Sequence, residues 1–197
     1  MEIIPTILEK DFDLAENRFS QVKDFSPWVQ IDVIDNIFTS GKSFELELIS
    51  KLNHLKPVLW DIHLMVKEPI NWIKKCLFVG AYRISGQVEM MSDRNVFVTE
   101  IKNLGLEAGL AFDIDTPLGN IPNECDLILL MARKAGFSHC PLDNRIYQKI
   151  VDAKKYGKKV AIDGGVDPNN FFKIKKSGAD LIYSGQSFLD LINEKEN

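Results

Sequence analysis

The chain has 197 residues, of which 45% are hydrophobic and 26% charged, which is typical of one globular domain and excludes a disordered or fibrous protein. Its formal net charge is −4, and its 24 Lys and Arg residues are scattered, whereas nucleic-acid-binding proteins concentrate basic residues on one face. No segment approaches the roughly 20 apolar residues that a membrane-spanning helix needs. We therefore expect neither a nucleic-acid nor a membrane partner.

Short apolar segments alternate along the chain with amphipathic segments, a pattern typical of parallel strands that are each followed by a covering helix. The predicted strands are 3–7, 28–34, 58–65, 82–88, 108–112, 127–131, 160–162 and 181–183. Eight such units without a break in composition favour a closed (β/α)8 barrel, or TIM barrel, over an open doubly wound sheet, which commonly has five or six strands. We expect residues 1–197 to form one α/β domain of this kind.

Two of the predicted helices have clear end signals. Apolar residues recur at helical spacing over 11–23, and Asp11 is placed to cap that segment. The segment 168–177 follows Asp167, a second candidate cap, and ends before Gly178, a residue that often terminates helices.

The cysteines and the amino-terminal segment predict where the protein works. Cys76, Cys125 and Cys140 are odd in number and too widely spaced for a zinc site or a disulfide framework, so we expect free thiols in a reducing compartment. The first residues lack the basic region and long apolar run of a secretory signal. We therefore expect a cytoplasmic protein.

Several polar side chains lie within the predicted strands, although both faces of a strand are covered in a parallel barrel and its residues should be apolar. Gln30 and Asp32 are two residues apart and lie on the same side of the second strand. Asp61 and His63 share one side of the third strand, and Asp163 ends the seventh. We expect this group to face the mouth of the barrel.

The residue types in this group indicate two kinds of chemistry. Carboxylates and imidazole are common ligands of divalent cations. Asp32 and Asp163, from strands far apart around the ring, are also placed to face each other across a substrate, so that one withdraws a proton and the other returns one. Each residue alone is more often a cap, a loop anchor or a hydrogen-bonded core residue, and their convergence is what favours function.

Glycines at two strand ends predict a phosphate site. Gly164 and Gly165 follow the seventh strand, and Gly185 and Gln186 follow the eighth, before a short helical segment at 188–192. Many barrels bind phosphate between these two loops, where glycine permits close backbone approach and a helix amino terminus attracts the anion. A pair of glycines is also common in an ordinary turn.

Together these segments resemble the ribulose-phosphate 3-epimerase family over nearly the whole chain. The resemblance is carried by residues 4–8, 30–35, 61–66, 163–166, 178–180 and 184–185, with shorter similarities at 116–118 and 136–137. It implies a TIM barrel of the ribulose-phosphate-binding type. It also implies an isomerase of carbohydrate metabolism that converts D-ribulose 5-phosphate to D-xylulose 5-phosphate through an enediolate.

The resemblance also implies roles for individual residues. Asp32 and Asp163 match the acid–base pair and two ligands of a divalent metal ion (Zn, Fe, Mn or Co), and His63 matches a third ligand. The other implied contacts are to substrate or phosphate: Thr6, in place of a family serine, with Met65, Met131, Gly136, Gly164, Gly165, Gly185 and Gln186. Both methionines are equally explained as core filling. A homo-oligomer is implied as well.

The chain departs from the family pattern at several positions. Gln30 replaces a metal-binding histidine, which predicts weaker metal binding or preference for a harder ion. The segment 85–87 lacks the histidine of the fourth strand, and 133–139 retains only Gly136 and the next residue of a glycine-rich lid. After the second strand, Ile34 and Asn36 replace a methionine and a glycine.

These departures leave other functions open. One is a non-catalytic barrel that binds a phosphorylated ligand or a partner protein, which would not exchange the C3 proton of a ketose phosphate with deuterated water. Another is an epimerase of a hexulose phosphate. A related decarboxylase would need Asp-x-Lys-x-x-Asp on the third strand, where 61–66 has neither the lysine nor the second acid.

Overall fold

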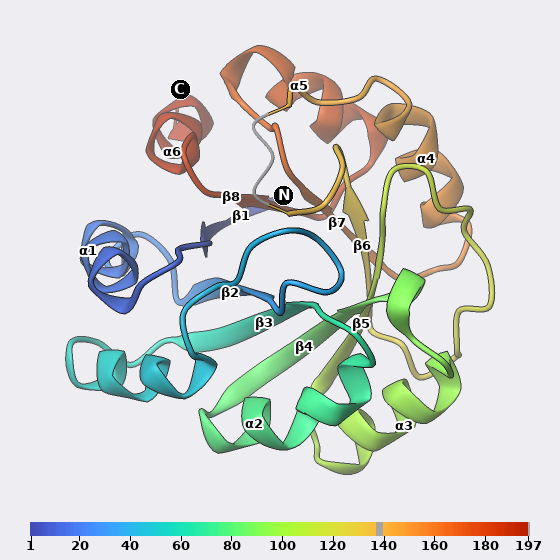
Figure 1. The fold of residues 1–197 in the computed structure, drawn as a ribbon. Coiled ribbons are helices and arrows are strands. Elements are labelled where there is room, and N and C mark those ends of the chain that lie inside the picture. The colour runs from blue at the N-terminus through green and yellow to red at the C-terminus, as the bar shows by residue number, and fades with distance from the viewer. Residues whose placement is uncertain (137–139, 197) are drawn as a thin grey trace.

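The computed structural model describes residues 1–136 and 140–196, and within them eight parallel strands close into a barrel in sequence order (Figure 1). The strands are β1 (Glu2–Ile7), β2 (Trp28–Ile34), β3 (Leu59–Met65), β4 (Ala81–Gln87), β5 (Glu107–Phe112), β6 (Leu127–Met131), β7 (Lys159–Asp163) and β8 (Leu181–Ser184). β8 pairs with β1 and closes the ring. The predicted TIM barrel is confirmed, and each predicted strand overlaps an observed one.

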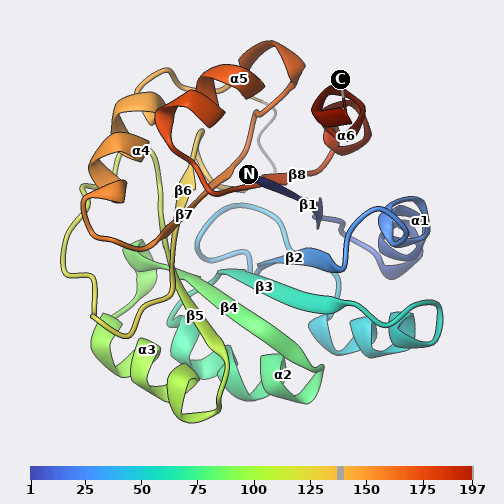
Figure 2. The same ribbon diagram turned by 180° about the vertical axis from the view of Figure 1, so that it is seen from behind.

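Helices surround this barrel on its outside (Figure 2). They are α1 (Phe12–Val22), α2 (Ile73–Phe78), α3 (Arg94–Asn103), α4 (Ile146–Lys154), α5 (Pro168–Ser177) and α6 (Phe188–Glu196), with 3-10 segments η1 (Leu46–His54), η2 (Pro69–Trp72) and η3 (Val88–Met90). The Asp11 carboxylate accepts from the Leu14 amide, and Gly178 ends α5 with a left-handed φ of 102°. Among the described residues no helix is both long and apolar enough to cross a membrane.

The sequence predicts a helix after every strand, and this prediction is wrong at one connection. Residues 113–126, all of which the structure describes, join β5 to β6 without a helix. Pro117 and Pro122 lack an amide hydrogen, and Asn120 has a left-handed φ of 50°, so this segment does not sustain helical hydrogen bonding. The ammonium of Lys149 on α4 instead donates to the carbonyls of the loop, among them Thr116 O at 2.7 Å.

The interior of the barrel has a polar floor below the residues of the mouth. Arg83 pairs with Asp61 at 2.9 Å and with Glu107 at 2.7 Å, and its guanidinium lies 4.4 Å from the centre of the Trp28 ring. The Tyr183 hydroxyl donates to the same Asp61 carboxylate. The position of Asp61 beside His63 in the sequence predicted a place at the mouth. That prediction is wrong, because these contacts hold Asp61 one layer deeper, in the floor.

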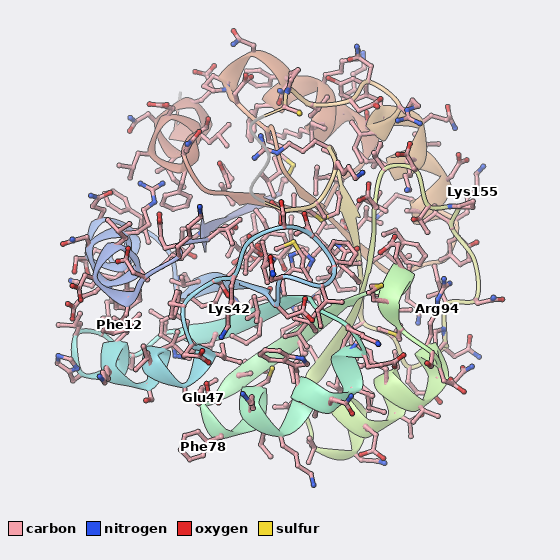
Figure 3. The ribbon with its side chains drawn as sticks, viewed as in Figure 1. Phe12, Lys42, Glu47, Phe78, Arg94 and Lys155 are labelled. Atoms are coloured by element: carbon pink, nitrogen blue, oxygen red, sulfur yellow. The ribbon has the colours of Figure 1, made fainter. Side chains whose placement is uncertain are left out.

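The loop after β2 lies across the centre of the ring and covers part of the mouth in Figure 1; Lys42, labelled in Figure 3, belongs to it. Its first turn is held by Asp35, whose carboxylate accepts from the amides of Ile37 and Phe38. Asn36 has a φ of 66°, a left-handed value that asparagine tolerates, and its side-chain oxygen accepts from the Gly41 amide at 2.8 Å. Asparagine is therefore compatible with this turn.

Candidate active site

The structure brings together Asp32, His63 and Asp163 from β2, β3 and β7. One potential ligand atom from each lies within 4.8 Å of the others, and all three side chains are buried. His63 Nδ1 is 2.9 Å from Asp32 Oδ1 and 3.6 Å from Asp163 Oδ2. The register explains the meeting, because Asp32 pairs with His63 across β2 and β3 while Asp163 is the last residue of β7.

Gln87 holds the other side of the imidazole. Its amide lies 3.2 Å from His63 Nε2; with the amide oxygen on that side it accepts from Nε2–H, while the amide nitrogen donates to Glu89 at 2.7 Å. With a hydrogen on Nε2, His63 directs Nδ1 at the two carboxylates, and a proton bridges Nδ1 and Asp32 Oδ1 across 2.9 Å. Gln87, expected only as the loss of a histidine, therefore fixes the orientation of His63.

The surroundings of Asp163 and His63 favour the protonated form of each. Burial raises the pKa of Asp163 to about 7, and the negative charge of Asp32 adds to this rise. Burial lowers the pKa of His63, but its hydrogen bond to Asp32 and the charges of both aspartates outweigh burial, so the pKa is raised overall. A proton shared among these groups therefore offsets part of the repulsion between the carboxylates.

The same three residues fit a divalent cation. Ligand atoms lie about 2 Å from a bound ion, so two ligands of one ion are separated by about 3 to 4 Å, close to the spacing of this cluster. Gln30 is less suited in its present orientation, because its amide oxygen accepts from the Thr6 hydroxyl at 2.8 Å. Gln30 Nε2 is buried without a hydrogen-bond partner among the described residues.

A cavity of about 570 Å³ opens above this cluster. Its lining includes both aspartates and every predicted substrate or phosphate residue: Thr6, Met65, Met131, Gly136, Gly164, Gly165, Gly185 and Gln186. His63 is fully buried behind it. A larger depression of about 720 Å³ lies outside the barrel between α4 and the helix-free connection, and contains none of these residues.

The glycines of the mouth allow close contacts between loops. Gly164 has a φ of 94°, and a Cβ there would lie 2.9 Å from Arg133 Cγ. Gly165 has a φ of 72°, and a Cβ there would lie 2.9 Å from the amide nitrogen of Leu142. Gly185 has neither constraint, since its Cβ would meet only an ordinary contact at 3.6 Å.

Sequence reasoning missed two arginines that line the cavity, Arg18 on α1 and Arg133 after β6. Arg133 lies where the family has a lid segment, so its position next to the end of β6 was the available signal. Arg18 had none, since it lies on a helix whose pattern indicates only a buried face. Residues 137–139 of the predicted lid segment lie outside the described residues.

Solved structures share the fold. A tryptophan synthase α-subunit mutant from Pyrococcus furiosus has a TM-score of 0.70 at 15% identity and covers 98% of this chain and 91% of that chain. Phosphoribosyl anthranilate isomerase from Thermus thermophilus has a TM-score of 0.72 at 10% identity, covering 95% of this chain and 88% of that chain. At such identities the likeness shows the barrel architecture alone.

Sequence comparisons identify the family. A ribulose-phosphate 3-epimerase of Synechocystis sp. is 27% identical, covering 98% of this chain and 90% of the relative, and one of Buchnera aphidicola is 29% identical, covering 95% and 88%. The model of the Ribulose-phosphate 3 epimerase family matches residues 2–189. The chain therefore belongs to the ribulose-phosphate 3-epimerase family and is an enzyme of the epimerase class, as its motifs predict.

Proposed function

We propose that the protein interconverts D-ribulose 5-phosphate and D-xylulose 5-phosphate, with Asp32 and Asp163 as its acid–base pair. The observation that carries the proposal is the convergence of these two carboxylates, from β2 and β7, on the imidazole of His63 beneath one cavity. The names of the relatives from Synechocystis and Buchnera support the substrate. The alternative decarboxylase is disfavoured because Asp61 is bonded to Arg83 and Tyr183 in the barrel floor.

Epimerisation at C3 needs one ionised and one protonated carboxyl group at the same time. The ionised group takes the C3 proton, and the electron pair of the broken C–H bond moves toward the C2 carbonyl to give an enediolate. The protonated group then delivers its proton to the opposite face of C3, so the two carboxyls exchange protonation states. A pKa of about 7 for Asp163, raised by burial and then by the charge of Asp32, supplies the protonated partner near neutral pH.

The residues around the pair set its geometry. Gln87 contacts Nε2 of His63 and orients the ring, so Nδ1 is held against both carboxylates. Asp32, His63 and Asp163 would hold a divalent ion, for which we propose Zn, Fe, Mn or Co; when bound, it would supply Lewis-acid stabilisation of negative charge on the substrate oxygens. We also propose a cytoplasmic location, from the three widely spaced cysteines, and a homo-oligomer, from the family resemblance.

The test is proton exchange at C3. The protein, loaded in turn with each proposed metal, is incubated with ribulose 5-phosphate in deuterated water, and the C3 proton signal is followed by NMR. We expect exchange together with formation of xylulose 5-phosphate, and neither in Asp32→Asn. Binding of the ketose phosphate without any exchange would show a non-catalytic barrel and refute the proposal.

A further inference from the structure

Charge is distributed unevenly in the cavity. The buried carboxylates of Asp32 and Asp163 lie beneath the cavity, while Arg18 and Arg133, together with Lys10 and Lys134, belong to the lining with the glycine loops after β7 and β8. The lining holds three other acids. Asp11 and Asp167 cap helices, accepting from amides at the starts of α1 and α5, and Glu9 lies close enough to Arg18 for their charges to interact. An anionic group is repelled by the deep end and attracted to the arginines.

Arg133 lies flat against the loop after β7. A Cβ on Gly164 would be 2.9 Å from Arg133 Cγ and 3.1 Å from Arg133 Nε. Arg133 therefore occupies the space that a side chain at position 164 would fill. Its Nη1 donates to Cys140 O at 3.0 Å, which uses one of the five N–H groups of the guanidinium. Contacts at its aliphatic part and at its guanidinium hold the side chain of Arg133, which is only partly exposed.

Arg18 acts on the loop after β8 instead. Its Nη2 donates to Gly185 O, and its Nη1 donates to Gln21 Oε1 at 3.1 Å. The Phe188 amide also donates to Gly185 O, so the same carbonyl starts α6. Arg18 thereby ties α1 to the loop from which the amino terminus of α6 begins, where backbone N–H groups favour an anion.

We propose that Arg133 binds the phosphate of the ketose phosphate between the loops Gly164–Gly165 and Gly185–Gln186, and that Arg18 positions the second loop. This inference rests on the proposed function and names the residue that recognises the anionic end of its substrate. A guanidinium offers paired N–H groups that match two phosphate oxygens, which selects a dianionic head group over a neutral hydroxymethyl end. The carbon chain then extends toward Asp32 and Asp163.

Inorganic phosphate is the probe, titrated calorimetrically into the metal-loaded protein. Arg133→Met should weaken phosphate binding about 10- to 100-fold, the range for losing a charged hydrogen bond, and should raise KM for ribulose 5-phosphate similarly while kcat changes less than about threefold. Arg133→Lys should recover part of both losses. The matched control is Arg145→Met, which removes an exposed arginine paired with Asp143 and Asp115 outside this cavity.

Unchanged phosphate affinity in Arg133→Met, or a wild-type protein that does not bind phosphate, would overturn the inference. Should the methionine variant fail to fold, Arg133→Lys and Arg133→Gln decide, because only the lysine retains a charge and should bind phosphate more tightly. If phosphate binding follows Arg133 as expected but ribulose 5-phosphate is not turned over, the anion site stands and the proposed function alone fails.

Discussion

Replacing Asp163 with asparagine tests the acid–base pair most directly. The variant keeps the size of the side chain but removes its ability to carry a proton, and it replaces one carboxylate ligand by a neutral amide. Proton transfer by a positioned side chain contributes about 10²- to 10⁴-fold to a rate, so kcat should fall by at least about 10²-fold. Exchange of the C3 proton in deuterated water should fall with it, because the same step is lost.

The stability of this variant separates lost chemistry from lost structure. The fold raises the pKa of Asp163 from 3.8 to about 7, so the associated stability is full below pH 3.8 and is lost as the pH rises past 7. At about 1.4 kcal/mol per pH unit, ionised Asp163 costs the metal-free protein up to about 4 kcal/mol. A neutral amide avoids this cost, so metal-free Asp163→Asn should be at least as stable as wild type at pH 8.

The measurements are NMR exchange at C3, metal content, and urea denaturation of the metal-free proteins at pH 8. Asp152→Asn, a change at a partly exposed acid on α4 whose only described salt bridge is to Lys155, is the control and should leave all three unchanged. Wild-type exchange in Asp163→Asn would refute the assignment. Marked destabilisation at pH 8 would refute the account of its pKa.

Three other predictions follow from the same contacts. Metal affinity should rise about tenfold per pH unit up to about pH 7, because the ion displaces the proton that Asp163 keeps below its raised pKa. Calorimetry that gave equal metal affinities at pH 5.5 and pH 7 would contradict this. Gly164→Ala should cost about 1 to 3 kcal/mol in urea denaturation, since its φ is 94° and Arg133 fills the space. Arg83→Met should lower the free energy of unfolding by about 3 to 5 kcal/mol, because it leaves the buried Asp61 carboxylate without its cation. Adding Asp61→Leu should restore most of that stability. An Arg83→Met variant as stable as wild type would disprove the pairing.

The barrel and the central cluster could be predicted because both depend on short-range rules. Strands β2 and β6 match their predicted bounds, since each is rich in β-branched, aromatic or other large apolar residues, and Pro27 and Asp126 mark where they begin. Asp32 and Asp163 were found because parallel strands bring their carboxyl ends to one edge, whatever the details of the helices. His63 followed from the alternation of side chains along β3.

Depth and long-range contact could not be predicted in this way. Alternation tells which side of β3 carries Asp61, but its layer depends on the stagger of neighbouring strands, and the β3–β4 register shifts between Trp60 and Asp61. The contacts of Arg18 and Arg133 depend on long side chains that reach another loop, which no periodicity encodes. The prolines of the connection between β5 and β6 are visible in the sequence, but its anchoring is not, because Lys149 lies 33 residues beyond the Thr116 carbonyl to which it donates.

The two glutamines that replace family histidines affect the cluster differently. Gln87 supplies the hydrogen bond that a ligating imidazole needs on its far nitrogen, so His63 is oriented although the histidine of the fourth strand is absent. Gln30 removes a neutral nitrogen ligand but no charge. The two retained carboxylates still match the two positive charges of a divalent ion. This match matters more than the lost ligand, because burying an unbalanced charge costs far more than losing one neutral ligand. The replacements therefore weaken metal coordination at the position of Gln30, while the charge balance on which metal binding depends is kept.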